Sequence, residues 1–600
     1  MKQPSKGQKL SVGLRNQLNM GSPSIEELLT IIDKQELLKN LRILSLDEIP
    51  KGHGATAALE GSFTILGQEF IIIIGFDEFF PIHKPQFFLK EEQKKLLPHI
   101  SSDGFVCFVQ EEDLIIDYTN IEGIIEESFN SVIKELTKGI TNKNQQDFVT
   151  EFEVYWARLK SDIDLYSLIK LGGKPRFLPL AKFKKSLIIG ETENAIKESF
   201  ITKKFLTKEE IDALTFKKAL YVPLKSSTIL IPPTKDKFWS NSEIVDFIFQ
   251  NVDLNYKKGL FELLKKYKKV GFTVIVDLPI NKESSALFGI SFNSKADAKP
   301  KKHPLLSREN KFTPSPINVF RFDKNYILPR GGASLAFSNK SVLLVGCGAV
   351  GSVIAEHLIK SGIINLALID NDYLKVENTY RHKLGLEYLH KNKAEALKED
   401  LEKNLVYSKI TAYPENLETF LKTKSDLLEN FDLIFSATAN PTINLFLNEF
   451  LNKNKPNLPV IFSWIDPYGI GGHAQLSNNN GKGCYNCLYS EATLDEGRFN
   501  RASFAKKDQT FGKTISGCGS TFTPFGALDA VQTAVMAVKL ALSVLQKKEE
   551  GNPIFSWKGD PIEFAANGYE LSNRYFLSQD QLETSRYDYD RKDCVICNKP

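Results

Sequence analysis

Four of the seven cysteines form two pairs with the spacing of metal ligands. Cys484 and Cys487 make one C-x-x-C unit, and Cys594 and Cys597 make another near the end of the chain. Each unit can offer two thiolates from one tight turn, and two units complete the tetrahedral four-thiolate site of structural Zn²⁺. The spacing therefore predicts a structural zinc site, and redox chemistry at one pair is the alternative.

A second motif is the glycine-rich stretch SVLLVGCGAVGS. Gly346, Gly348 and Gly351 follow an apolar, strand-like run and open a helix-like segment, the context in which G-x-G-x-x-G binds nucleotide phosphates. Asp370 ends the next strand-like run, where an acid can accept hydrogen bonds from ribose hydroxyls. These residues alone predict a nucleotide site, with NAD as the default ligand.

Polar residues downstream favour ATP instead. Asp372, Asn378 and Arg381 lie within DNDYLKVENTYRHKLG, and Lys393 follows in LHKNKAEAL. Two cations and several polar groups beside a nucleotide fit triphosphate binding and the neutralisation of developing negative charge. The alternative is that Arg381 and Lys393 are solvated charges on helix surfaces.

The arrangement resembles the adenylation domains of the E1 and ThiF/MoeB superfamily. The resemblance implies that these four polar residues bind ATP, that Mg²⁺ accompanies it, and that the domain forms a homodimer. It also favours zinc at the cysteine pairs. The sequence differs from the family at the magnesium-binding acid, where Ala439 stands, and Asp466 is a weak candidate to replace it.

Three cysteines lie outside the zinc pattern. Cys347, inside the glycine loop, is expected to serve packing only. Cys518, in TISGCGSTFTPFG, matches the position of a cysteine between the two zinc knuckles of ThiF/MoeB-type enzymes. A thiolate there could attack an acyl-adenylate and form a thioester. An inert core thiol is the alternative.

The last cysteine, Cys107, belongs to the stretch LPHISSDGFVCF. Together with His99 and Gly104 it resembles the H-P-N…G-x-x-C pattern of ubiquitin-conjugating (E2) enzymes. The resemblance implies that Cys107 carries an acyl group, while His99 organises the loop rather than acting as a base. An E2-like recognition module without activity is the alternative.

The asparagine that stabilises the oxyanion in E2 enzymes is missing after His99. Asn120 or a backbone N–H could replace it, and Asp113 or Asp117 could orient an incoming amine. Nothing in the sequence selects among these groups.

Composition limits the remaining possibilities. The chain is 42% hydrophobic and 25% charged, with a net charge of +4, as expected for an ordinary soluble protein that binds no nucleic acid. The N-terminus has no signal-peptide pattern, and the run FIIIIGF is far shorter than the roughly 20 residues of a membrane helix. A cytoplasmic protein without membrane contact is expected.

The elements that must position these residues fall into three predicted regions. Residues 1–160 form an α+β, E2-like domain with a helix capped by Ser24, strands at ATAALEGSF and EFIIIIGF, and a long helix in TNIEGIIEESFNSVIKEL. Residues 161–325 form a middle α/β linker domain with strands at ALYVPL, TILIPP and FTVIVDLPI. Residues 326–600 form a Rossmann-like ThiF/E1 adenylation domain with a doubly wound parallel sheet.

As a whole, this α/β multidomain chain resembles the Cap2 family, the bacterial E1–E2 fusions of type II CBASS antiphage operons. The resemblance implies ATP-dependent adenylation of the C-terminal glycine of a cGAS/DncV-like nucleotidyltransferase. It further implies thioester relay through Cys518 and Cys107 and conjugation to a target amine. Sulfur-carrier activation of the ThiF/MoeB type and a nucleotide-binding scaffold are the two alternatives.

Overall fold

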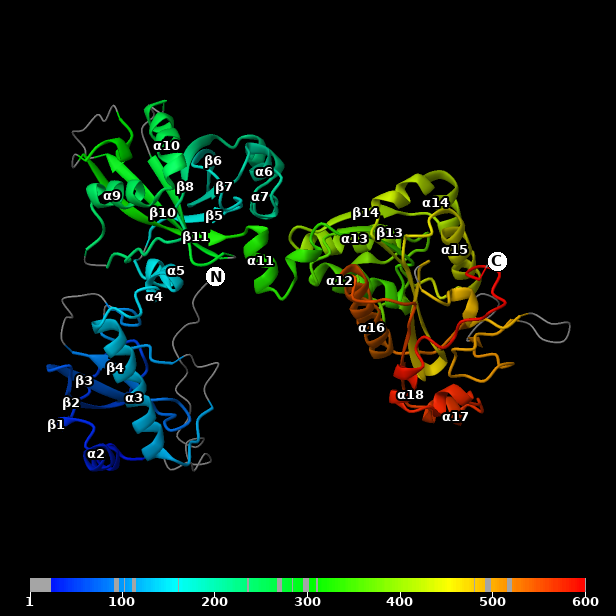
Figure 1. Ribbon diagram of the computed structural model, residues 1–600, viewed down its shortest axis with the longest axis horizontal. Coiled ribbons are helices and arrows are strands. Elements are labelled where there is room, and N and C mark those ends of the chain that lie inside the picture. The colour runs from blue at the N-terminus through cyan, green and yellow to red at the C-terminus, as the bar shows by residue number, and fades with distance from the viewer. Residues whose placement is uncertain are drawn as a thin grey trace. The chain divides into compact units, whose positions relative to one another are not determined.

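The computed structural model of the chain describes residues 23–598, apart from 91–96, 102, 110–114, 160, 235–236, 267–271, 283, 295–301, 309–310, 480, 492–497 and 515–520. It divides into two compact units, Met1–Phe322 and Asp323–Pro600 (Figure 1). Each unit has hydrophobic cores of its own.

The first unit opens with four antiparallel strands in sequential order, packed on one face against two helices. The capping box of Ser24 and Glu27 starts the first helix where the sequence predicts it. The two predicted strands and the long predicted helix are also present. The elements are α2 (Ile25–Lys34), β1 (Lys39–Ile43), β2 (Ala57–Ile65), β3 (Gln68–Phe76), β4 (Gln86–Leu89), α3 (Ile121–Ile140), α4 (Asp147–Thr150) and α5 (Phe152–Ala157).

The middle of the chain folds into a closed seven-stranded barrel in the order β10-β11-β5-β7-β6-β8-β9. Apolar side chains such as Leu178, Ile275 and Ile317 fill its interior. The strands are β5 (Asp164–Ser167), β6 (Arg176–Phe183), β7 (Ser186–Ile189), β8 (Phe216–Pro223), β9 (Phe272–Pro279), β10 (Ser285–Ser294) and β11 (Phe312–Arg321). The helices are α6 (Glu193–Lys197), α7 (Phe200–Phe205), α8 (Lys208–Asp212), α9 (Asn241–Asn251) and α10 (Leu254–Lys266).

The sequence predicted strands and helices for this region but not their closure into a barrel. One predicted strand, TILIPP, is wrong, since residues 228–233 have no regular secondary structure. Pro232 and Pro233 lack the N–H groups that a ladder of strand hydrogen bonds needs, so this apolar run does not join the barrel.

The second unit is built on a seven-stranded sheet in the order β14-β13-β12-β15-β16-β17-β20. The first five strands are parallel, β17 runs opposite to them, and β20 pairs antiparallel with β17, which confirms the predicted doubly wound fold. The strands are β12 (Ser341–Val345), β13 (Asn365–Ile369), β14 (Lys409–Tyr413), β15 (Leu433–Ser436), β16 (Val460–Ile465), β17 (Gly471–Ser477) and β20 (Ile554–Lys558).

Helices cover both faces of this sheet (Figure 1). One face packs against α12 (Ala349–Lys360), α13 (Lys393–Asn404) and α16 (Ala527–Leu545), and the other against α14 (Leu417–Lys424) and α15 (Pro441–Asn454). Three short helices complete the unit: α11 (Lys324–Arg330), α17 (Ile562–Ala566) and α18 (Gln579–Thr584).

Among the described helices, only α16 is long and apolar enough to cross a membrane by length and composition. Ala534, Ala537 and Ala541 of this helix are buried in the core that α16 shares with α12 and the sheet. Alanine allows two helices to approach closely, so α16 serves here as a core helix.

Candidate functional site

The glycine loop joins β12 to α12 at the carboxyl edge of the parallel strands. Gly346 has a φ of +89°, a left-handed conformation that glycine adopts without strain. A Cβ on Gly351 would lie 1.9 Å from the carbonyl oxygen of Gly346, so only glycine lets the helix start this close to the strand. A Cβ on Gly348, the N-cap of α12, would meet no atom within 4 Å. The loop is therefore tight at its ends and open at its centre.

A cavity of about 520 Å³ lies over this loop, and five of the predicted nucleotide-site residues line it. They are Gly346, Gly348, Asp370, Asp372 and Lys393. The cavity lies at the carboxyl ends of parallel strands, where doubly wound folds bind their ligands. Its other lining residues include Asn371, Glu415, Glu418, Thr438, Ala439, Ser463, Trp464 and Phe525.

Two carboxylates organise the charged side of the cavity. Asp370 accepts hydrogen bonds from the N–H groups of Cys347, at 2.7 Å, and Asp372, at 2.8 Å, and burial raises its pKa. Asp372 forms an ion pair with the buried Lys393. Burial alone would raise the pKa of Asp372, but the hydrogen bond from Lys393, the hydrogen bond from the N–H of Tyr373 and the nearby lysine charges together outweigh it, and the pKa is lowered. Lys393 is thereby held in a fixed place beside the glycine loop, where its ammonium group can meet negative charge.

Arg381 and Asn378 are not among the cavity-lining residues. The Arg381 guanidinium lies over the ring of Phe525, 4.5 Å from its centre, and Phe525 itself lines the cavity. The side chain of Asn378 accepts a hydrogen bond from the N–H of Lys375 and closes the short turn Val376–Asn378. Arg381 thus contacts Phe525, a cavity-lining residue, without lining the cavity itself. Asn378 stabilises the turn that precedes Arg381.

The sequence did not single out Ser463 and Trp464. The Oγ of Ser463 and the Nε1 of Trp464 are buried and have no hydrogen-bond partner among the residues that the structure describes. Both residues line the cavity from the carboxyl end of β16. Unpaired buried donors are costly, so a ligand that accepts hydrogen bonds is expected beside them. Their place at the end of a predicted parallel strand was the signal that could have identified them.

The two residues considered for magnesium have different roles. Ala439 lines the cavity but has no ligand atom in its side chain. Asp466 is buried, and its carboxylate accepts hydrogen bonds from the N–H of Phe504 and the hydroxyl of Ser503 and contacts Nε2 of His473 at 3.2 Å. The carboxylate of Asp466 is therefore hydrogen-bonded within the protein, and it does not line the cavity. The carboxylates that do line it are Asp370, Asp372, Glu415 and Glu418.

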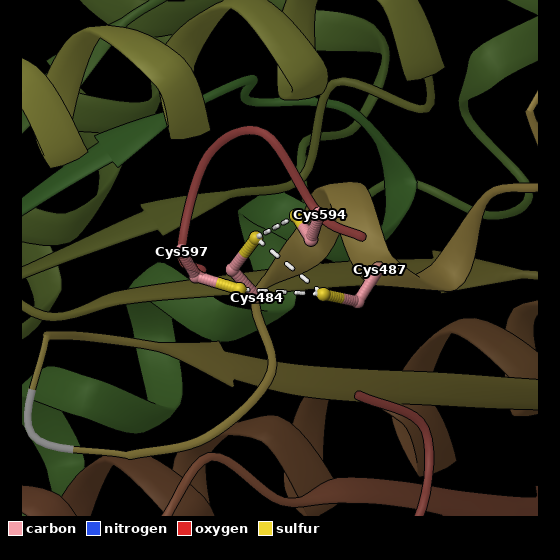
Figure 2. A group of neighbouring side chains, drawn as sticks. All are labelled: Cys484, Cys487, Cys594 and Cys597. Atoms are coloured by element: carbon pink, nitrogen blue, oxygen red, sulfur yellow. Dashed lines mark hydrogen bonds between the residues drawn. The ribbon is translucent and has the colours of Figure 1, made fainter. Parts of the chain in front are cut away.

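The four paired cysteines meet in one cluster, as the sequence predicts (Figure 2). The sulfur of Cys484 lies 4.0 Å from that of Cys487 and 3.8 Å from that of Cys594, and the Cys487 and Cys597 sulfurs are 3.4 Å apart. Zn–S bonds of about 2.3 Å in a tetrahedron place the sulfurs roughly 3.8 Å apart. The cluster is therefore compatible with zinc.

Side-chain amides support the cluster from outside. Nδ2 of Asn448 donates to the sulfur of Cys484, and Nδ2 of Asn486 donates to the sulfur of Cys594, each at 3.4 Å. N–H groups that point at sulfur favour thiolates, the form that binds a metal ion. The cluster brings the C-terminal segment, which carries Cys594 and Cys597, against the turn that carries Cys484 and Cys487.

Cys518 lies outside the described residues. It falls between two short antiparallel strands, β18 (Lys513–Thr514) and β19 (Thr521–Phe522). Shortly after β19, the carbonyl of Pro524 accepts a hydrogen bond from the N–H of Tyr468 at 2.6 Å, and Phe525 lines the cavity. The described chain thus leads from β19 directly to the candidate nucleotide site.

Cys107 is exposed at the end of an extended segment in the first unit. The carbonyl of Gly104 and the N–H of Val106 bond to β4 on one side, and the N–H of Cys107 bonds to the carbonyl of His99 on the other. Because side chains alternate along extended chain and Val106 is buried in the core, Phe105 and Cys107 lie on the opposite face. A Cβ on Gly104 would lie 2.1 Å from the Leu89 carbonyl oxygen, so this close pairing requires glycine.

The imidazole of His99 contacts two carboxylates. Its Nδ1 lies 3.0 Å from Oε1 of Glu151, and its Nε2 lies 3.1 Å from Oδ2 of Asp147. The hydrogen bond with Glu151 is the largest cause that raises the pKa of His99 to about 9. At neutral pH the ring is therefore a cation and cannot take a proton. This geometry fits the organising role expected for His99, because the carbonyl of the same residue accepts a hydrogen bond from the N–H of Cys107.

Asn120 and Asp117, two of the groups considered beside Cys107, have local partners. Oδ1 of Asn120 caps α3 by accepting the N–H of Gly123 at 2.9 Å. Asp117 accepts hydrogen bonds from the N–H and hydroxyl of Thr119. Both residues line a cavity of about 320 Å³ that also includes Phe108. Asp113 lies outside the described residues.

Two protein families match the chain, one in each unit. Residues 37–164 match prokaryotic E2 family B, and residues 327–567 match the ThiF family. The chain is 24% identical to the ATP-dependent ubiquitin transferase-like protein Cap2 of Escherichia coli, over 75% of this chain and 80% of that protein. It is 22% identical to Cap2 of Pseudomonas aeruginosa, over 74% and 79%.

A crystal structure of E. coli MccB covers 46% of this chain and 70% of MccB, at 19% identity and a TM-score of 0.32. The two family matches and the similarity to Cap2 proteins along three quarters of the chain agree with the motifs placed above. The chain is an E1–E2 fusion of the conjugating-enzyme type, similar to the Cap2 proteins, with an E2-like domain followed by a ThiF-type adenylation domain.

Proposed function

We propose that the chain activates the C-terminal glycine of a partner protein with ATP and joins it to an amine of a target. The partner is a cGAS/DncV-like nucleotidyltransferase, and the setting is antiviral defence in the cytoplasm. The enzyme acts as a homodimer through its adenylation domain. The observation that carries this proposal is a glycine-loop cavity with a fixed Lys393 in one unit and an exposed Cys107 in the other.

In the first step, a carboxylate oxygen of the glycine attacks the α-phosphorus of ATP, and pyrophosphate leaves. The open centre of the glycine loop and the N-terminus of α12 offer N–H groups to the phosphates. Lys393 neutralises the charge that develops there. Mg²⁺ usually binds through phosphates and one or two carboxylates, which the cavity offers at Asp370, Asp372, Glu415 and Glu418.

Two thioester steps follow. The Cys518 thiolate attacks the acyl carbon and AMP leaves, and the Cys107 thiolate then takes the acyl group as the Cys518 thiolate leaves. An amine finally attacks the Cys107 thioester, forms the amide and releases the thiolate. Each thioester keeps the carbonyl reactive, and the first transfer frees the nucleotide site for another cycle.

The cysteine cluster is proposed to bind one structural Zn²⁺. Four thiolates close the coordination sphere, so the ion would hold the C-terminal segment in place and take no part in acyl transfer. Metal analysis should find one zinc ion per chain, and Cys594→Ser should remove it. A zinc-free protein with a folded C-terminal segment would contradict this assignment.

The relay is tested by trapping each acyl form. With ATP and a partner that ends in glycine, Cys107→Ala should accumulate a thiol-sensitive adduct at Cys518, and Cys518→Ala should stop at the adenylate. Both are read by intact mass and non-reducing electrophoresis. Cys347→Ala, which removes a fully buried thiol, is the matched control and should complete conjugation.

The contrary outcomes separate the alternatives. Release of a modified partner from Cys518 without Cys107 would support sulfur-carrier activation, because that reaction needs only residues 326–600. If the wild-type protein with its partner shows no ATP–pyrophosphate exchange, adenylation is excluded and a nucleotide-binding scaffold is the remaining alternative.

A further inference from the structure

The E2-like domain contains two histidine–aspartate pairs, and three of their four residues, His53, Asp77 and His83, line a second cavity. Nδ1 of His83 lies 2.5 Å from Oδ2 of Asp77, and Nε2 of His53 lies 2.8 Å from Oδ2 of Asp103. The cavity measures about 390 Å³. It is lined by His53, Asp77, Ile82, His83, Lys84, Gln86, Phe105 and Ile116. The adenylation chemistry uses none of these groups.

This cavity adjoins the extended segment that leads to Cys107. Phe105 lines it, and the alternation established above places Cys107 on the same face of the extended segment, two residues further on. The neighbouring residues Val106 and Phe108 face the core instead, where Phe108 packs edge-on against Phe87. A cavity that contains Asp77 and His83 therefore lies next to the extended segment that carries Cys107.

The two histidines differ in what they can do. His53 stacks on Phe105 at 4.5 Å and packs edge-on against Phe88, so its ring is held as part of the domain core. The side chain of His83 is 53% exposed, and its partner Asp77 is fixed by the N–H of Phe79 at 3.0 Å. Asp77 favours the tautomer with a proton on Nδ1, which leaves the lone pair on Nε2. Among the described residues Nε2 has no hydrogen-bond partner, and the side chain that carries it is more than half exposed.

The geometry points to His83, oriented by Asp77, as the general base for the amine that attacks the Cys107 thioester. Nε2 of His83 takes one proton from the lysine ammonium, and the freed lone pair of the nitrogen bonds to the acyl carbon. The C–S bond breaks as the Cys107 thiolate leaves, and the second nitrogen proton passes to that thiolate. The proton on His83 then returns to solvent. The carboxylate of Asp77 also attracts a cationic amine to the cavity. The ammonium group of Lys84, which also lines the cavity, donates a hydrogen bond to the carbonyl of Val109 at 2.8 Å.

This inference rests on the proposed thioester at Cys107, so its test begins from that species. Full-length protein is loaded with a glycine-ending partner, ATP is removed, and the thioester is chased with either lysine or hydroxylamine. Lysine is mostly protonated at neutral pH and needs a base, whereas hydroxylamine is already uncharged. Loss of a general base costs about 10²- to 10⁴-fold in rate. We expect His83→Gln to slow discharge to lysine at least tenfold and to leave discharge to hydroxylamine within a factor of three.

His53→Gln removes the other imidazole of the same cavity and serves as the matched control, with a smaller effect on lysine discharge than His83→Gln. Asp77→Asn should act in the same direction as His83→Gln. Equal loss with both amines would mean that His83 only shapes the site, and normal lysine discharge in His83→Gln would rule out a base there. Either result overturns the inference. Failure of the wild-type protein to form a thioester at Cys107 would instead contradict the proposed function.

Discussion

At the scale of single residues, the surroundings of each cysteine distinguish its role more clearly than its place in a motif. Cys347 lies inside the most recognisable motif of the chain, yet its thiol is fully buried and burial raises its pKa well above the ordinary value. Cys107 lies in an incomplete motif, yet it is exposed. Because the thiolate is the nucleophile, the exposed residue is the better carrier of an acyl group.

The glycine loop offers a residue-scale prediction that separates folding from binding. Gly351→Ala forces a Cβ to 1.9 Å from the Gly346 carbonyl oxygen, and should destabilise the second unit by about 2 kcal/mol or more. Gly348→Ala adds a Cβ that meets nothing within 4 Å of the protein, but it occupies space where phosphates are expected. It should change stability by less than about 1 kcal/mol and raise the KM for ATP roughly tenfold, a 1.4 kcal/mol loss of binding.

Thermal unfolding and ATP–pyrophosphate exchange measure the two effects. A Gly348→Ala protein with unchanged KM would show that phosphates do not approach the loop centre. A Gly351→Ala protein as stable as the wild type would show that α12 can shift away from β12 without cost.

At the scale of elements, one short helical segment joins the Cys107 loop to the barrel. His99 binds Asp147 and Glu151 from α4 and its end, while its N–H donates to the hydroxyl of Tyr155 on α5 at 2.8 Å. Further along α5, Nε1 of Trp156 donates to the Ile317 carbonyl of the barrel at 3.0 Å. The position of the Cys107 loop is thus tied to helices that also pack on the barrel.

This arrangement makes the Cys107 loop sensitive to pH. The folded-state pKa of His99, about 9, lies above its ordinary value of 6.5. The contribution of the His99 ion pairs is therefore complete below pH 6.5 and is lost as the pH rises through about 9. It amounts to at most about 3 kcal/mol of local stability. Amide hydrogen exchange over residues 97–109, corrected for the intrinsic rate, should speed up across this window, and His99→Gln should abolish that pH dependence. An identical rise in His99→Gln would assign it to another group.

Local signals in the sequence were sufficient for several elements. The capping pattern at Ser24 located the start of α2, and the glycines after an apolar run located the turn between β12 and α12. In both cases the determining contacts lie within a few residues of one another. The paired cysteines were predictable for a different reason, since a metal site requires four ligands and the chain offers one such set.

Contacts between distant residues could not be predicted in the same way. The barrel closes by pairing β5 with β11, which are about 150 residues apart, and no local pattern encodes that pairing. Asp466 is occupied by Phe504 and His473, which approach it only in the folded sheet. Asp77 and His83 are close in sequence, but the cavity that they line together with Phe105 is formed only in the folded domain. The sequence thus predicted which residues could take part in chemistry. Whether a side chain is free to meet a ligand, or is already bonded within the protein, depends on tertiary packing.

At the scale of the whole molecule, the two units hold different parts of the chemistry. The nucleotide cavity and the cysteine cluster belong to Asp323–Pro600, and Cys107 with its histidine–aspartate pairs belongs to Met1–Phe322. Each unit has its own buried core, so each is expected to fold as a separate chain. The covalent link would then serve to keep the two thiols at high effective concentration.

Separating the units tests this last point. Residues 323–600 alone should retain ATP–pyrophosphate exchange and load Cys518, because all the residues proposed for these steps lie within them. Transfer to Cys107 should require added residues 1–322. At micromolar concentrations it should be roughly 10²- to 10³-fold slower than in the intact chain and proportional to concentration, since a short linker supplies an effective concentration near the millimolar range. Single-turnover transfer of a labelled partner measures both rates. A mixture as fast as the intact chain at every concentration would show that the units associate without the link, whereas a complete absence of transfer at saturating concentrations would remove Cys107 from the relay.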